Sequence, residues 1–522
     1  MQKPTLSFWQ MWNLSFGFFG VQIAYALQSA NISRIFATLG ADPHTLSFFW
    51  VLPPLMGMIV QPIVGSLSDK TWCKWGRRKP YLYIGAIVAI IVMALLPNSG
   101  SFNLTVKAAL AFGAVMLMLL DTSINMAMQP FKMMVGDMVN EEQKTKAYSI
   151  QSLLCNAGSL VGYLFPYIFT WLGVQSVAPE GQIPASVTWS FYIGAAILIL
   201  CVLYTGAKVK EWNPEDYAKY NNIKKEDKEE STNLLSLLFH APKAFWQIGL
   251  VQFFSWFAFL YMWTYTTGGI AETVWDAIDP TTKAYQEAGD WTGLLFAVQA
   301  VGSILWAMVI PMFRNAKVAY SLSLVLGAVG FISTYFIHDQ YLLFVSFLLI
   351  GCAWAAMLAL PFALLTNALT GKSLGSYMGL FNCTICLPQI VASLVGGVLF
   401  MTFGGQTKYV EVPVVEDKTE TEIVGEVAEQ PAEAEVLEFE VVAEEIATEE
   451  IATEEVVAEE MATEEVVAEE MATEEAVAEA EPVKTEMKKF QSGQIIMLVI
   501  AGVSLLLGAL AVFGISSKRR EE

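Results

Sequence analysis

The stretch from Asp121 to Asp137 reads D-T-S-I-N-M-A-M-Q-P-F-K-M-M-V-G-D and continues a long apolar run. It contains four polar side chains at helical spacing, namely Asp121, Asn125, Gln129 and Lys132. On an α-helix these positions form one polar stripe. Ionisable side chains at membrane depth normally face a protein interior or a water-filled path. The stretch therefore predicts a membrane helix with a functional polar face.

The whole chain has the composition of a polytopic membrane protein. Of its 522 residues 55% are hydrophobic and only 15% are charged. Hydropathy predicts twelve transmembrane helices and hence an all-α membrane protein. The first six lie near 8–29, 47–67, 81–96, 108–128, 149–172 and 189–204. The other six lie near 245–267, 291–313, 318–337, 341–360, 375–400 and 494–515.

These helices divide the chain into two halves and two other segments. We expect an N-terminal six-helix half at 1–204, a cytoplasmic connector at 205–244 and helices 7–11 at 245–405. An acidic extracytoplasmic insert at 406–489 precedes helix 12 and a short tail at 490–522. Short matches between corresponding helices, such as Q-P-F at Pro130 and L-P-F at Pro361, indicate two parallel repeats.

Lysine and arginine set the orientation. Twenty-one of them fall on the side of the connector, and outside the insert the opposite side has only Arg34, Lys107 and Lys283. The positive-inside rule therefore predicts that both termini are cytoplasmic. No cleavable signal peptide is evident, so we expect the first helix to stay in the membrane.

The acidic insert accounts for the net charge of the chain. It carries 28 acidic residues and 5 lysines, so the remainder is weakly positive. From Val441 to Ala480 it consists of eight pentapeptides such as I-A-T-E-E. A five-residue period spreads apolar residues around a helix, and adjacent glutamates repel each other. We expect a disordered or weakly helical spacer outside the transport core, with a partner- or cation-binding rod as the alternative.

Within the polar stripe, Asp121 is the candidate for proton coupling. Asp121 and Lys132 are separated by about 16 Å of helical rise, too far for direct pairing. We expect Lys132 to pair with Asp137 or with the loop at Asp69, which leaves Asp121 without a partner at membrane depth. The alternative is a buried carboxylate satisfied by neighbouring amides.

Amide, hydroxyl and aromatic side chains elsewhere in the spans are candidates for substrate binding. Sugar hydroxyls need paired donors and acceptors, and a pyranose face stacks on aromatic rings. With the stripe residues Asn125, Gln129 and Lys132, the candidates are Gln22, Tyr25, Gln28, Trp256, Tyr261, Thr264, Asn382 and Gln389. Hydrogen bonding between helices explains several of them equally well.

The loop between the second and third helices predicts a conformational latch. It reads G-S-L-S-D-K from Gly65 and G-R-R-K-P from Gly76. Glycine allows close helix approach, and arginines donate hydrogen bonds to the ends of neighbouring helices. The gating candidates are Gly65, Asp69, Gly76, Arg77, Arg78 and Asp137. The alternative is a basic run that only enforces topology.

We expect neither a metal site nor a cofactor. Cys383 and Cys386 have C-x-x-C spacing, but they lie within a predicted span and have no histidine nearby, so they are expected to be packing residues. No predicted span combines a nucleophile with a base, so the sequence does not predict an enzyme.

Four motifs in order resemble the glycoside-pentoside-hexuronide and sucrose-carrier branch of the major facilitator superfamily. They are the loop D-K-x5-G-R-R-K-P, the stripe D-x-x-x-N…Q-P-x-K…D, P-F-A-L from Pro361, and G-L-F-N…P-Q from Gly379. Lys132 stands where that family has arginine, and the seventh helix lacks its carboxylates. The resemblance covers all twelve predicted helices and excludes the insert.

The resemblance implies a major facilitator fold and proton-coupled symport of a disaccharide such as sucrose or maltose by alternating access. The alternatives are a sodium-coupled glycoside symporter of the melibiose type and a non-transporting membrane sugar receptor. We expect a monomer in the cell (inner or plasma) membrane, with a sugar, a proton and membrane lipid as partners and no nucleic acid.

Overall fold

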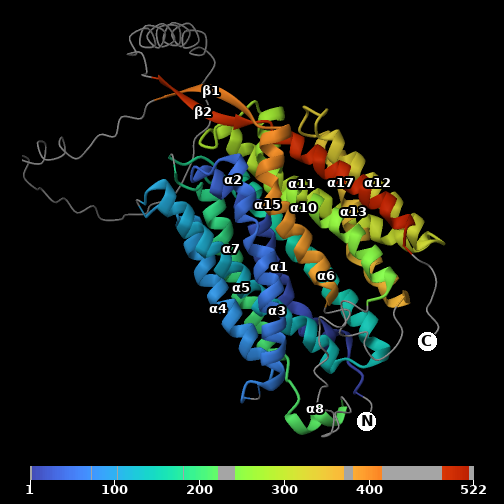
Figure 1. Ribbon diagram of the computed structural model, residues 1–522. Coiled ribbons are helices and arrows are strands. Elements are labelled where there is room, and N and C mark those ends of the chain that lie inside the picture. Colours follow the sequence, from blue (N-terminus) through green and yellow to red (C-terminus); the bar gives the residue numbers. More distant parts are fainter. Residues whose placement is uncertain are drawn as a thin grey trace, which may run out of the picture. The chain divides into compact units, whose positions relative to one another are not determined.

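The computed structural model describes residues 3–71, 73–102, 104–179, 181–220, 241–368, 380–413 and 485–515. The chain separates into two units, one of Met1–Thr407 with Phe490–Glu522 and one of Lys408–Lys489. Long helices build the first unit (Figure 1). Eleven helical segments in the described ranges are long and apolar enough to cross a membrane. The predicted all-α membrane protein is therefore confirmed.

The first half contains α1 (Phe8–Thr38), α2 (Pro43–Phe49), α3 (Leu52–Lys70), α4 (Lys79–Leu95), α5 (Val106–Met138), α6 (Lys144–Trp171) and α7 (Ala185–Lys208). Short 3-10 turns at Leu96–Asn98 and Glu141–Gln143 follow α4 and α5. The predicted second span is broken between α2 and α3, and prolines at 53 and 54, which cannot donate a backbone N–H, begin the second piece. The connector contributes α8 (Pro214–Tyr220).

The second half contains α10 (Lys243–Val274), α11 (Lys283–Val309), α12 (Ala316–Ser333), α13 (Leu343–Ala368), α15 (Cys383–Phe403) and α17 (Ile495–Phe513). A 3-10 turn at Ile310–Met312 ends α11. Strands β1 (Gln406–Pro413) and β2 (Thr485–Ser492) pair in a two-stranded sheet at the two ends of the predicted insert. The pentapeptide repeats between them lie outside the described residues.

Helix packing repeats from one half to the other. In the first half α1 packs on α7, α4 on α5 and on α7, and α3 on α5. The corresponding pairs in the second half are α10 with α17, α12 with α13 and with α17, and α11 with α13. This correspondence is the parallel repeat that the short sequence matches indicate.

Helix α1 is long but is not among the eleven apolar segments. Its polar side chains lower its hydropathy, and its second half is buried by other helices instead of facing lipid. Close packing on α6 is possible because Gly158 and Gly162 have no side chain. A Cβ on Gly158 would lie 2.3 Å from the carbonyl oxygen of Phe19, and a Cβ on Gly162 would lie 2.8 Å from that of Ile23. The core of the first half therefore forms around a polar helix.

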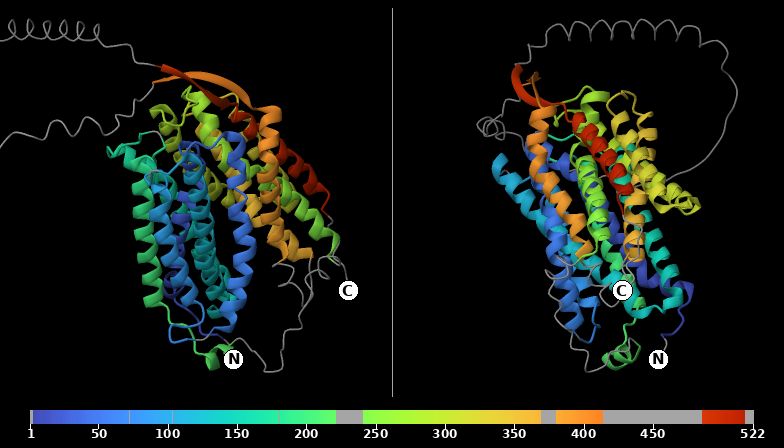
Figure 2. Two further views of the ribbon diagram at one scale, coloured as in Figure 1. Left: turned by 60° about the vertical axis from the view of Figure 1, so that its left-hand side comes forward. Right: turned by 45° about the vertical axis from the view of Figure 1, so that its right-hand side comes forward.

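The two halves meet through α1 with α10 and α11, α2 and α3 with α15, and α6 with α11. In the left view of Figure 2 the helices of the second half tilt away from those of the first toward the end that carries α8. The halves therefore approach each other most closely at the opposite end, where α1, α6 and α10 end and α11 begins.

Candidate functional site

Asp121 lies on α5, is 1% exposed, and faces α1. Its Oδ2 accepts a hydrogen bond of 2.9 Å from Nε2 of Gln28, which is equally buried. The expectation that Asp121 has no partner is therefore wrong, because packing of α1 on α5 brings in an amide from 93 residues away. The partner is neutral, so the carboxylate is hydrogen-bonded without an ion pair in the described part of the chain.

Two further amides extend this contact toward α3. The Asn125 side chain donates to the backbone oxygen of Asp121 at 2.9 Å and accepts from Gln61 at 2.7 Å. Gln61 was not among the candidates, although it is an amide within an apolar span directly before a proline. Three helices thus contribute amides to one buried cluster, which we name the Asp121 cluster: Gln28, Gln61, Asp121 and Asn125.

Lys132 does not pair with Asp137. The carboxylate of Asp137 is instead bound by Arg78, and the Asp69 side chain lies outside the described residues. Lys132 is exposed to solvent although it lies within a membrane helix, and it is in electrostatic range of Cys155 on α6 and Cys386 on α15. Its side chain therefore faces the space between the two halves.

The other stripe and α1 candidates lie on the same side of the first half. Gln129 faces α3, where a Cβ on Gly65 would lie 3.8 Å from its amide nitrogen. Gln22 accepts from Ser159 of α6 at 3.3 Å. Tyr25 is partly exposed and in electrostatic range of Asp121 and Cys386. Tyr25 therefore lies between the Asp121 cluster and the second half.

The second-half candidates are mostly engaged within their own half. Tyr261 donates to the backbone oxygen of Ala392 at 3.2 Å, and Thr264 to that of Leu260 at 2.9 Å. Trp256 packs edge to face on Trp354, with ring centroids 5.7 Å apart. Asn382 and Gln389 bond within or beside α15, to Cys386 Sγ and to the Ile385 oxygen respectively. The structure gives none of these side chains a contact with the Asp121 cluster.

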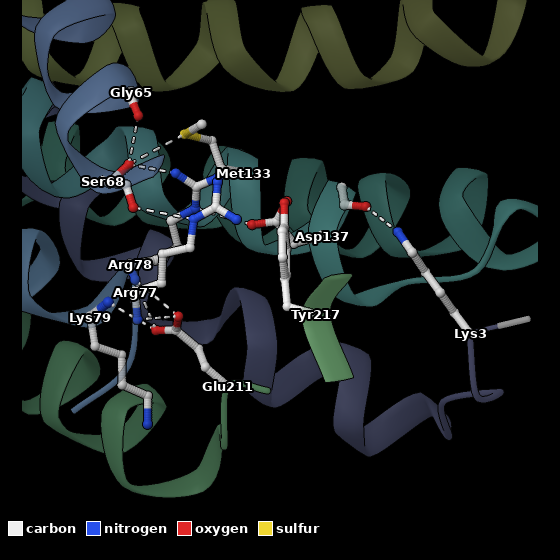
Figure 3. Close-up of polar contacts among 11 residues, drawn as sticks. Lys3, Gly65, Ser68, Arg77, Arg78, Lys79, Met133, Asp137, Glu211 and Tyr217 are labelled. Carbon is white, nitrogen blue, oxygen red and sulfur yellow. Dashed lines mark hydrogen bonds and ion pairs between the residues drawn. The ribbon is translucent and has the colours of Figure 1, made fainter. Parts of the chain in front are cut away.

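The predicted latch joins α3, α4 and α5, and Figure 3 shows its side chains. Arg78 donates from Nε to Asp137 Oδ2 at 3.0 Å and from Nη1 to Ser68 Oγ at 2.5 Å. Arg77 donates to the Ser68 backbone oxygen at 3.2 Å. Both arginines are almost fully buried. Gly76 has φ of +114°, a conformation that favours glycine and turns the chain into α4.

Glu211 and Tyr217 of the connector complete the latch, and sequence reasoning missed both. The Glu211 carboxylate accepts from the backbone N–H groups of Arg77, Arg78 and Lys79 at 2.7 to 3.2 Å. It therefore caps the N-terminus of α4, where negative charge is favourable.

Tyr217 contacts the arginine and the aspartate of the latch together. Its ring lies 4.3 Å from the Arg77 guanidinium carbon, and its hydroxyl donates to Asp137 at 3.1 Å. Burial and then the Asp137 charge raise the pKa of Tyr217, so the hydroxyl keeps its proton. Only the acidic, aromatic character of the segment after α7 could have pointed to these two residues.

At the other end of the bundle, a buried ion pair crosses between the halves. Arg34 of α1 donates from Nη1 to Asp290 of α11 at 2.6 Å and from Nε to Gln286 at 2.6 Å. Thr170 of α6 donates to the second oxygen of Asp290 at 2.6 Å. The Arg34 and Asp290 side chains are 1% and 4% exposed. Because the positive-inside rule predicts that this end faces outward, we name this group, Arg34 with Thr170, Gln286 and Asp290, the outer seal.

Aromatic rings continue the contact between the halves next to the outer seal. Tyr163 packs on Phe296 with ring centroids 5.7 Å apart, and Trp50 stacks on Trp263 at 6.0 Å. The Tyr163 backbone oxygen would lie 2.4 Å from a Cβ on Gly293 of α11. The surfaces at this end therefore fit closely enough to exclude a side chain.

Comparison with known proteins places these features in a family. Residues 16–415 match the family model described as "MFS/sugar transport protein". The chain is 23% identical to "Sucrose transport protein SUC3" of Arabidopsis thaliana, over 74% of this chain and 82% of that protein. It is 24% identical to "Sucrose transport protein SUT1" of Oryza sativa subsp. japonica, over 74% and 81%. A mouse "Membrane-associated transporter protein" is 27% identical over 39% of each chain.

Solved structures share the fold. An inward-facing, unoccupied bacterial homologue of the human lysosomal transporter Spinster has a TM-score of 0.56 at 14% identity, covering 76% of this chain and 82% of that one. A D-xylose-proton symporter has a TM-score of 0.53 at 15% identity, covering 75% and 88%. At this identity the likeness concerns the fold alone.

Proposed function

Because the chain belongs to the MFS/sugar transport protein family, we propose that it is a secondary active transporter that carries a disaccharide together with a proton. It is a multi-pass membrane transporter and not an enzyme. The proposed substrate is a sucrose- or maltose-like glycoside, and the proposed mechanism is alternating access. The observation that carries the proposal is the buried Asp121 cluster.

A buried carboxylate suits proton coupling when nothing nearby neutralises it permanently. Asp121 accepts from one neutral amide, and in the described residues no lysine or arginine bonds to it. A charge in such a place is costly, so the group can bind and release a proton as its access to water changes. An ion pair such as that between Arg34 and Asp290 would instead keep the carboxylate charged.

The surroundings of Asp121 suit a neutral, hydroxyl-rich substrate. Gln28, Gln61 and Asn125 supply donors and acceptors, and the partly exposed Tyr25 adds an aromatic ring near Asp121. Sugar hydroxyls both donate and accept, so amides match them in either role. Lys132, exposed between the halves, adds a donor for a ring or hydroxyl oxygen.

The two ends of the bundle suit alternating access. If the basic side is cytoplasmic, the outer seal lies at the outer face and the latch at the inner face. The outer seal closes the path between the halves, and the latch bonds lie within the first half and the connector. In this orientation the carrier is closed to the outside. The proposal includes cytoplasmic termini and a location in the cell (inner or plasma) membrane.

Uptake of labelled sucrose and maltose into proteoliposomes, under separately imposed proton and sodium gradients, tests the proposal. We expect a proton gradient to drive accumulation and Asp121→Asn to abolish it while sugar exchange across the membrane persists. Accumulation driven by sodium alone would favour the sodium-coupled alternative. An Asp121→Asn carrier that still accumulates sugar against a gradient would refute coupling at this residue.

A further inference from the structure

Gln28 of α1 bonds directly to Asp121, the proposed proton site. In the part of the chain that the structure describes, it is the only side chain that hydrogen-bonds the Asp121 carboxylate. Its amide oxygen, Oε1, is buried and has no hydrogen-bond partner there. A buried polar atom without a partner is unfavourable, so its position needs an explanation.

The two ends of the Gln28 amide suit the two protonation states of a carboxyl group. A carboxylate only accepts hydrogen bonds, and the amide N–H now supplies one. A carboxylic acid also donates a hydrogen bond, so it needs an acceptor such as the amide carbonyl oxygen. Rotation of the amide by about 180° about its last torsion exchanges its nitrogen and oxygen within the same space. Oε1 would then lie where Nε2 lies now, 2.9 Å from Asp121 Oδ2.

We propose that Gln28 is a positioning residue that follows the proton on Asp121, donating to the carboxylate and, after rotation of its amide, accepting from the carboxylic acid. This inference rests on the proposed proton coupling at Asp121. In the step, an O–H bond forms at Oδ2 with a proton taken from water on one side of the membrane, and the same bond breaks when the proton leaves to the other side.

The two orientations of the Gln28 amide leave the same number of polar atoms without a partner, so rotation of the amide is reversible. In the charged state one amide atom, Oε1, has no partner, and in the protonated state the amide nitrogen takes that place. Each state therefore has one satisfied and one unsatisfied end, and neither is trapped by a large difference in hydrogen bonding. A fixed donor such as lysine or arginine would hold only the carboxylate.

Other titratable groups near Asp121 do not take over this role. Tyr25 on α1, Tyr163 and Cys155 on α6, and Cys386 on α15 lie in the same electrostatic neighbourhood. On α5 itself the nearest is Lys132, about 16 Å along the helix. Helices α3 and α4 carry their described titratable side chains at the end near the latch, namely Lys79, Tyr81 and Tyr83. The structure shows none of these groups bonded to the carboxylate.

The pH dependence of sugar uptake in proteoliposomes tests the proposal, with Gln28→Met as the variant. Methionine has a similar length but neither donates nor accepts as an amide does. Both protonation states lose a hydrogen bond in this variant, but a bond to a charged carboxylate is about twice as strong as a bond between neutral groups, so the loss favours the protonated form. We therefore expect the alkaline limb of the uptake profile to move to higher pH by about one unit. Gln28→Asn, which keeps a shorter amide, should restore part of the wild-type profile.

Asn31→Leu is the matched control. Asn31 is a buried amide on the same helix whose side chain bonds only to the Leu27 backbone oxygen in the described structure. It should leave the pH profile in place even if it lowers the yield of folded carrier. Size-exclusion profiles of each purified variant separate folding losses from transport effects.

Two results distinguish the failure of this inference from that of the proposed function. If Asp121→Asn abolishes accumulation but Gln28→Met leaves the pH profile unmoved, the role of Gln28 is refuted and proton coupling stands. If Asp121→Asn still accumulates sugar, the proposed coupling itself fails. In an Asp121→Asn background, adding Gln28→Met should not shift the pH dependence of sugar exchange, and a shift there would also overturn the inference.

Discussion

Arg34 and Asp290 meet at 2.6 Å across the boundary between the two halves of the protein, 256 residues apart in the sequence. Both side chains are almost fully buried, and Gln286 and Thr170 bond to the same pair. An ion pair this deeply buried is costly to break on one side only, because the remaining charge loses its partner. The pair can therefore hold the halves together at this end until both groups move apart.

Replacing one member of the pair should destabilise the carrier more than replacing both. Asp290→Asn leaves the Arg34 charge buried without a counter-charge, and such changes cost about 3–5 kcal/mol. The double variant Arg34→Gln with Asp290→Asn removes both charges and should recover part of this loss. Thermal unfolding of purified single and double variants measures the coupling. Strictly additive effects would show that the ion pair does not stabilise the closed outer end.

A side chain on Gly293 should oppose closure of the outer end. A Cβ there would lie 2.4 Å from the Tyr163 backbone oxygen, and backbone atoms yield little. We expect Gly293→Ala to shift the carrier toward an outward-open state. Ser33 lies buried at this contact, where its hydroxyl donates to the Trp263 backbone oxygen at 3.0 Å. Labelling of a cysteine introduced at Ser33, in a cysteine-free background, with a membrane-impermeant maleimide should become faster.

Gly136 provides the control for that substitution. A Cβ at this position meets only the Tyr148 hydroxyl at 3.8 Å, an ordinary contact, and the site is at the latch end of α5. Gly136→Ala should leave the labelling rate unchanged. Equal labelling of Gly293→Ala and wild type would contradict a tight outer seal in this region.

Loss of the Glu211 cap should slow transport without changing sugar affinity. Its carboxylate accepts from three consecutive backbone N–H groups at the start of α4, far from the Asp121 cluster. Capping interactions of this kind contribute about 0.5–2 kcal/mol. We expect Glu211→Gln to lower the maximal uptake rate several-fold at an unchanged KM. A raised KM with an unchanged rate would place Glu211 in substrate binding instead.

Two variants of Tyr217 separate the contribution of its hydroxyl to transport from that of its ring. Tyr217→Phe removes the hydroxyl bond to Asp137 and keeps the ring on Arg77. Tyr217→Ala removes both. We expect the alanine variant to lose more transport rate than the phenylalanine variant in the same uptake assay, and equal losses would assign the whole effect to the hydroxyl.

Removing the charge of Lys132 should weaken sugar binding. Its side chain is exposed between the halves, and it does not pair with Asp137 as the sequence predicts. Lys132→Met should raise the KM for uptake by about tenfold, the loss expected for one hydrogen bond from a charged group. Lys132→Arg keeps charge and donors and should stay closer to wild type. An unchanged KM in Lys132→Met would exclude Lys132 from the substrate path.

Several features of the protein could be predicted because they depend on local composition. Each apolar run must satisfy its own backbone hydrogen bonds in lipid, so helices follow from the run length alone. The sequence likewise indicated that Arg77 and Arg78 bond to neighbouring helix ends, whereas their gating role stays a prediction. The local pattern nevertheless predicted the wrong partner for Lys132, because Arg78 at the start of α4 binds Asp137 instead.

The sequence by itself determined that Asp121 lies at membrane depth on one polar face of a helix, but only the tertiary structure decided what that face meets. Packing of α1 on α5 brings Gln28 to the carboxylate, and small residues on α6, such as Gly158, let α6 approach the same helix closely. The same helix carries Arg34 to Asp290 in the other half. Hydropathy is a property of each segment, whereas partners between helices depend on how all of them pack together.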